Sequence, residues 1–421
     1  MDLFYNQYFN INKHVSMICG LWPFQSQFGR RISYMIFAMS TFSMIFSLVS
    51  IGILNFQLTF YSQQLKCSYF ILKKTAGIIS QLNPDLLNIL ETCVALFFCV
   101  CGFLVCTILY NQKNQIKRLY ERIAADWENL TDDLERDVLR TFLLEGRKLI
   151  FITLVYSFPA FSLFACITFL PRMFSEESTK LCLHSFPYYL ESMVIDKNLC
   201  NLQVSLHYSV ALGYVGLSFL SVGATYICSV KHVCALYEIA RLRLENATVR
   251  YGNYDPLGEL TDETSIIHNL IEAIDMHKNA LRGIQIIEQV FSTGFFIIQI
   301  FGLSLLAILI CELKYHEGEI TEMIRFMLVL SVFVIYLFFM NWSGEQVIQS
   351  CDDIQKTAYD IDWHRISSRT RIFVLMIMQR TLKPVHLTAG NMMILSIQNF
   401  GTILKSAWSF GTILLTTQKS V

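Results

Sequence analysis

The stretch FMLVLSVFVIYLFFM, residues Phe326–Met340, contains no charged side chain and few polar ones. With its flanks it forms an apolar segment over residues 322–343. A helix rises about 1.5 Å per residue, so about 20 apolar residues cross the roughly 30 Å hydrocarbon layer of a bilayer. The stretch lacks the alternation over units of about ten residues that is typical of a membrane β-strand. It therefore predicts a transmembrane helix.

Six further segments have the same character. They cover residues 32–54, 87–110, 150–172, 204–230, 290–312 and 393–415. The composition agrees, because 54% of the 421 residues are hydrophobic and only 16% are charged, against about 25% charged residues in an average soluble protein. We expect an all-α membrane protein with seven transmembrane helices in the lipid bilayer. The net charge of zero gives no reason to expect nucleic acid as a partner.

The positive charges are distributed unevenly between the two sides of these spans. The segments on the side of the amino terminus carry 23 lysine and arginine residues, and those on the opposite side carry 7. Cytoplasmic loops hold the excess of positive charge in membrane proteins. The amino terminus is therefore predicted to be cytoplasmic, and seven spans then make the carboxyl terminus extracellular. This orientation is the reverse of that of a G-protein-coupled receptor.

The spans divide the chain into four expected regions. These are a cytoplasmic amino-terminal segment (1–31), a six-helix transmembrane bundle (32–343), cytoplasmic anchor helices (344–392), and a last helix with a short extracellular tail (393–421). Apolar residues at three-and-four spacing in 111–149 and 265–289 predict amphipathic helices that prolong the spans into the cytoplasm. The alternative is that these two helices lie on the inner leaflet.

The cysteines and the short motifs give little sign of catalysis. Cys182 and Cys200 fall in the predicted outer loop 173–203, where a disulfide and two free thiols both remain open. No set of cysteines and histidines has the spacing of a metal site. The chain also lacks a nucleotide-binding loop, a zinc-protease motif and GxSxG. We expect no enzyme, no catalytic residue, no metal and no cofactor.

The last span differs from the others because one of its faces is polar throughout. That face carries Gln398, Thr402, Lys405, Ser409, Thr412 and Thr416. Polar groups in hydrocarbon are costly unless they face water or protein, so this helix is predicted to line a water-filled pore, with several subunits supplying one copy each. Ile413, beside the stripe, could form a hydrophobic constriction. Alternatively, the hydroxyls bond to helix carbonyls and Lys405 reaches toward the cytoplasmic face.

The outer halves of spans two, three, four and six are rich in aromatic side chains and contain isolated polar atoms. A largely apolar cavity with a few polar groups suits a small volatile ligand. The candidate ligand-binding residues are Leu90, Val94, Phe97, Phe158, Phe161, Ser162, Ala165, His207, Val210, Tyr214, Phe326 and Leu330. Ordinary helix packing is the alternative for each of them, and for His207 a hydrogen bond to a neighbouring helix.

The carboxyl-terminal third of the chain resembles the insect odorant receptor family. Four stretches carry the likeness: Trp342–Ile348 (WSGEQVI), Ala358-Tyr359 with Trp363, Met378–Pro384 (MQRTLKP) with Leu387–Gly390 (LTAG), and Phe400–Phe410 (FGTILKSAWSF). The family often ends the last span with Ser-Tyr-Phe-Thr, and here Phe410 and Gly411 replace the two aromatics. Length, seven spans and inverted orientation are similar to the family over the whole chain.

The resemblance implies an odorant-gated, nonselective cation channel. Its partners would be odorant co-receptor subunits in a heteromeric tetramer, and its location the plasma membrane of olfactory dendrites. By similarity, Thr417 joins Thr412, Ile413 and Thr416 at the narrow part of the pore, and the ligand pocket lies among spans two, three, four and six. A homomeric channel similar to gustatory receptors is the main alternative. A G-protein-coupled receptor and a secondary transporter are weaker ones.

Overall fold

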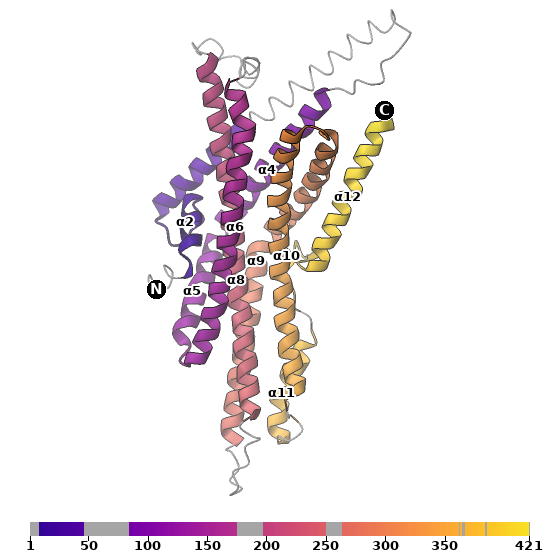
Figure 1. Ribbon diagram of the computed structural model, residues 1–421. Coiled ribbons are helices and arrows are strands. Elements are labelled where there is room, and N and C mark those ends of the chain that lie inside the picture. The colour runs from indigo at the N-terminus through magenta and orange to yellow at the C-terminus, as the bar shows by residue number, and fades with distance from the viewer. Residues whose placement is uncertain are drawn as a thin grey trace, which may run out of the picture.

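The computed structural model describes residues 8–45, 84–174, 197–249, 263–361, 363, 367–383 and 385–420, which are almost entirely helical (Figure 1). The elements are α2 (Asn10–Ile18), α4 (Pro84–Asn111), α5 (Lys113–Asn129), α6 (Asp133–Phe174), α8 (Lys197–Val249), α9 (Glu263–Tyr315), α10 (Ile320–Asp360), α11 (Ser368–Thr381), β1 (Thr388–Ala389), β2 (Met393–Ile394) and α12 (Ile397–Ser420). Residues 27–45 are also helical.

Five of the described helices are long and apolar enough to cross a membrane, namely α4, α6, α8, α9 and α10. They correspond to predicted spans two to six. Of the first predicted span, residues 32–45 are helical, and residues 46–54 lie outside the described residues. The helix α12 covers the last predicted span but is less apolar than the five, because it carries Lys405 and several hydroxyl and amide side chains.

Several spans continue well beyond the thickness of a bilayer. The helices α8 and α9 each have 53 residues, so each is about 80 Å long. They pack against one another, and α6 and α10 pack against α8. The turn between α5 and α6 and the helix α11 lie toward one end of the bundle, and the carboxyl end of α12 lies toward the other (Figure 1). The prediction that the spans are prolonged as helices is confirmed.

The chain between α10 and α12 contains a long helical extension and a short hairpin. The helix α10 is continuous across residue 343, so the first of the expected cytoplasmic anchor helices (344–392) is the prolongation of span six. The last helix begins at Ile397 rather than at residue 393. Met393 and Ile394 instead pair with Ala389 and Thr388 in a short antiparallel hairpin.

The hairpin has a local cause in its turn. Gly390 and Asn391 both have positive φ, at 64° and 57°. Glycine and asparagine are the residues that most readily adopt this left-handed conformation. The turn therefore reverses the chain before α12 can begin.

Charged side chains join the helices in the layer that the charge distribution assigns to the cytoplasm. Arg243 of α8 forms an ion pair with Glu135 of α6 at 2.6 Å, and this bond raises the pKa of Arg243. Asp126 of α5 lies 3.1 Å from Nε2 of His232 on α8. Burial alone would raise the pKa of Asp126, but the hydrogen bond and charge of His232, with Asn279 and Arg122, lower it. These contacts hold α5 and α6 against α8 and α9.

Candidate ligand cavity and outward face of the last helix

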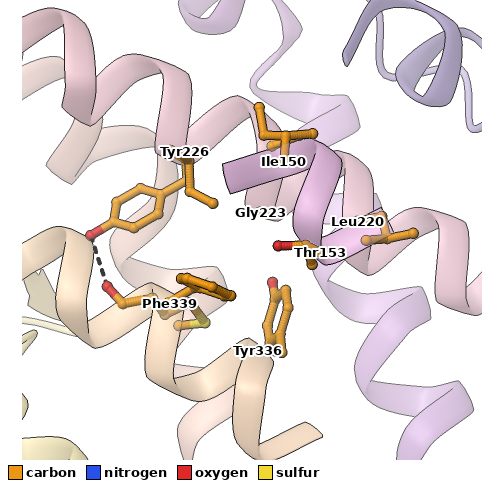
Figure 2. A pocket seen from close by; sticks show the side chains of 10 residues that line it. Ile150, Thr153, Leu220, Gly223, Tyr226, Tyr336 and Phe339 are labelled. Carbon is orange, nitrogen blue, oxygen red and sulfur yellow. Dashed lines mark hydrogen bonds between the residues drawn. The ribbon is translucent and has the colours of Figure 1, made fainter. Parts of the chain in front are cut away.

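A small cavity lies where α6, α8 and α10 meet (Figure 2). Its lining is mostly apolar and aromatic. The lining residues are Ile150 and Thr153 of α6, Leu220, Gly223, Ala224, Tyr226 and Ile227 of α8, and Tyr336, Phe339 and Met340 of α10. A predominantly apolar lining with few polar atoms is typical of sites for small organic ligands.

Three hydroxyl groups supply the polar atoms of this cavity. The Tyr226 hydroxyl donates to the carbonyl of Met340 at 3.4 Å, and the Thr153 hydroxyl donates to the carbonyl of Leu149 at 2.8 Å. The buried hydroxyl of Tyr336 has no hydrogen-bond partner among the described residues. It points toward Thr153 (Figure 2). Since an unpaired buried hydroxyl is costly, Tyr336 is the group best suited to donate to a ligand oxygen.

The space between these side chains is narrow. Its volume is about 20 Å³, which is room for about one water molecule. A β-carbon at Gly223 would lie 3.2 Å from the Tyr336 ring, so the glycine allows the ring to lie close against α8. An organic ligand can therefore enter only if side chains such as Tyr336 or Phe339 change rotamer.

The cavity lies deeper than the predicted ligand-binding residues. Three of the four expected spans contribute, as α6, α8 and α10, but none of the twelve candidates lines it. On α6 the lining residues Ile150 and Thr153 precede the first candidate, Phe158, and on α10 Tyr336 follows the last candidate, Leu330. Thr153 and Tyr336 place hydroxyl groups within apolar runs of the sequence. This pattern could have indicated a cavity at their level of the bundle, but the prediction did not use it.

The candidates themselves occupy varied surroundings. Phe326 is buried and stacks on His316 with ring centroids 5.6 Å apart, and Phe97 packs edge-to-face with Phe301. The Ser162 hydroxyl donates to the carbonyl of Phe158 in its own helix.

The other candidates divide by exposure. Phe158 and Val210 are exposed, whereas Val94, Phe161, Ala165, Tyr214 and Leu330 are half-buried. The side chains of Leu90 and His207 lie outside the described part of the chain. The role of all twelve as ligand contacts stays a prediction.

The last helix has one face against its own chain and one face away from it. Ile403, Ala407 and Gly411 are buried, and a β-carbon at Gly411 would lie 3.2 Å from the carbonyl oxygen of Ala307 on α9. The polar stripe lies on the outward side. Gln398, Thr402, Lys405, Ser409 and Thr416 are exposed, as is Ile413, while Thr412 is half-buried. The Thr417 side chain lies outside the described residues.

Some of the stripe hydroxyls also bond to their own helix, as the alternative interpretation expected. Thr402, Thr412 and Thr416 donate to the carbonyls of Gln398, Ser409 and Ile413 at 2.8–3.0 Å. Each oxygen still keeps lone pairs that can accept a hydrogen bond from water. Back-bonding and an outward polar face are therefore compatible.

The base of α12 is attached to α10 by close contacts. The Glu345 carboxylate accepts a hydrogen bond from the backbone N–H of Ile397 at 3.1 Å, and the Asn399 side chain donates to Asn341 Oδ1 at the same distance. A β-carbon at Gly344 would clash with Leu395. Gly344 belongs to the WSGEQVI stretch that carries the family resemblance. The structure gives a physical reason for its being glycine.

The described residues hold no group of three or more metal-ligating side chains. Cys182 lies outside the described residues, and the side chain of Cys200 is likewise not described. The disulfide between them stays a prediction.

The five long apolar helices define the class of this molecule, which is a multi-pass helical membrane protein. A family model described as "7tm Odorant receptor" matches residues 85–408. The chain belongs to this odorant receptor family.

Individual relatives and structures agree with this assignment. "Putative odorant receptor 92a" of Drosophila melanogaster is 23% identical over 162 residues, which is 38% of each chain. The structure of the insect olfactory receptor OR5 from Machilis hrabei has a TM-score of 0.66 and 12% identity, covering 99% of both chains. Its complex with eugenol has a TM-score of 0.69 with the same identity and coverage. These structures establish the fold.

Proposed function

We propose that this chain is the ligand-binding subunit of an odorant-gated cation channel in the plasma membrane. Family membership makes it an odorant receptor, and the channel activity is the further step. One observation carries that step. The polar stripe of α12 points away from its own bundle, while Ile403, Ala407 and Gly411 are buried on the face toward it. A polar face directed away from the protein is stable in a bilayer only if it meets water or other subunits.

The ligand of this channel is a small volatile, and its site is the cavity among α6, α8 and α10. The apolar lining and the free Tyr336 hydroxyl support a ligand with one hydrogen-bond acceptor on an apolar body. The partner is a set of odorant co-receptor subunits, because a single α12 cannot enclose a pore. Ligand binding would move α10, and this movement is transmitted to α12 through the contacts of Asn341, Gly344 and Glu345.

The test is current from cells that express this chain with or without the odorant co-receptor, under a panel of volatiles and with G-protein signalling blocked. Rapid current only in the co-expressing cells is expected. Current from this chain alone would favour the homomeric alternative. The same recordings are made without the block. A response that is present without the block and absent with it would contradict the channel proposal.

A further inference from the structure

A second hollow lies directly beside the ligand cavity, on the outside of the bundle. It is an open groove of about 350 Å³ between α6, α10 and α12. Its walls are Ile152, Thr153, Tyr156, Val334, Ile335, Phe338, Phe339 and Phe400, and its lining exposes no polar surface. The groove is thus large enough for a small ligand, and its lining is as apolar as the hydrocarbon layer of the bilayer.

Two residues belong to both hollows. Thr153 and Phe339 line the narrow cavity and also the open groove. A single layer of side chains therefore separates a 350 Å³ groove from a 20 Å³ cavity. Of the two shared residues, Phe339 has the larger side chain. Rotation of its ring would connect the groove with the cavity. Phe338, next to it, lies edge-to-face with Phe400 of α12, so this wall is made of aromatic rings.

We propose that the α6–α10–α12 groove is a lateral entry site, through which apolar volatiles dissolved in the lipid reach the cavity, with Phe339 as the gate. An apolar molecule concentrates in the hydrocarbon layer because burial there removes its surface from water. The groove offers it a site with no polar group to desolvate. This inference rests on the proposed function in one respect, which is that the cavity beyond Phe339 is the ligand site.

The experiment uses the full-length chain in lipid nanodiscs and a trifluoromethyl-phenyl-diazirine, a small apolar carbene precursor that partitions into lipid. After photolysis, peptide mass spectrometry locates the label. Label is expected on Phe338 in the groove and on Tyr336 and Met340 in the cavity. Ile152→Trp fills the groove and should reduce cavity labelling several-fold.

Val155→Trp is the matched control for this substitution. Ile152 and Val155 are both β-branched side chains of α6, and they are 55% and 51% exposed. Val155 lines neither hollow. The control should therefore leave cavity labelling unchanged. A second variant, Phe338→Ala, widens the groove and should make cavity labelling faster.

Three results would overturn the inference. Equal cavity labelling in wild type, Ile152→Trp and Val155→Trp would mean that the cavity is reached by another route. Label on groove residues without label in the cavity would mean that the groove holds only lipid. An unlabelled groove would mean that another subunit covers it. None of these readouts uses channel current, so a failure of the proposed function is recognised separately, by the absence of odorant-evoked current in wild type.

Discussion

At the scale of single residues, the phenol of Tyr336 is the cavity group best placed to form a hydrogen bond with a ligand. Its hydroxyl is buried and has no hydrogen-bond partner among the residues described, whereas the hydroxyls of Thr153 and Tyr226 are bonded to backbone carbonyls. A net hydrogen bond in such a site contributes about 1 kcal/mol. The selectivity of the receptor for oxygen-bearing volatiles should therefore depend on this side chain.

Tyr336→Phe should raise the half-maximal concentration for volatiles with an ether or carbonyl oxygen by about fivefold, because it removes a hydrogen bond of about 1 kcal/mol. Hydrocarbon analogues of the same shape should be unaffected. Dose–response curves for matched pairs of volatiles measure the difference. Tyr359→Phe, at an exposed tyrosine of the same helix that does not line the cavity, serves as the control. Equal shifts for both members of a pair would remove Tyr336 from ligand recognition.

Lys405 is an exposed cation on the outward face of α12. A unit charge about 8 Å from a permeating ion in water interacts with about 0.5 kcal/mol. Lys405→Glu reverses this contribution, so conductance or relative divalent permeability should increase several-fold. The set of active volatiles should stay the same. Reversal potentials in solutions of different divalent content make the measurement, and unchanged permeation would exclude Lys405 from the pore.

His277 of α9 is a buried histidine in the cytoplasmic layer, in contact with the Tyr237 ring. Burial, helped by the charge of Arg380, lowers its pKa to about 4. The folded state therefore resists protonation. Stability should fall as the pH drops from about 6.5 toward 4, by about 2 kcal/mol between pH 7 and pH 5.

The effect of His277 can be isolated by substitution. His277→Gln should remove that part of the pH dependence, as measured by thermal unfolding of the purified protein at both pH values. The same pH dependence in wild type and variant would show that His277 is not responsible for it.

At the scale of elements, the spans and their helical extensions were predictable, but the junctions and the cavity were not. Apolar runs such as Phe326–Met340 predict helices because hydrophobic length is a local property. The position of the cavity depends on how the side chains of three helices pack against one another, which is a property of the tertiary structure. The hairpin at 388–394 could have been predicted only by recognising Gly390-Asn391 as a turn between two helices. The outward face of α12 was predictable because its polar residues recur with helical spacing.

The junction of α10 with α12 supplies the prediction at this scale. Gly344→Ala places a methyl group into Leu395, and overpacking of this kind costs about 1–3 kcal/mol. The thermal unfolding temperature should fall, and coupling of ligand to current should weaken. Gly216→Ala on α8 is the matched control, since nothing lies within 4 Å of its added β-carbon. Equal behaviour of the two variants would mean that the junction tolerates displacement.

At the scale of the whole molecule, the proposed ligand cavity lies inside the helix bundle and the proposed pore-lining face lies on its surface. The cavity lies among α6, α8 and α10. The helix α12 lies at the edge of the bundle (Figure 1), and its polar stripe is exposed. In a bilayer such a stripe is stable only against water or other subunits, so the proposed pore requires further copies of this helix. The outward face of α12 is therefore the feature on which the proposed channel depends.

The most direct measurement of that feature is thiol accessibility along α12 during odorant-evoked current. Ser409→Cys and Thr416→Cys lie on the outward stripe, whereas Ile403→Cys and Ala407→Cys lie on the packed face. A small, membrane-impermeant cationic thiol reagent should block current through the two stripe variants and spare the two packed variants and the wild type. Block of the packed variants alone, or of none of the four in receptors that respond to odorant, would contradict a pore lined by this helix.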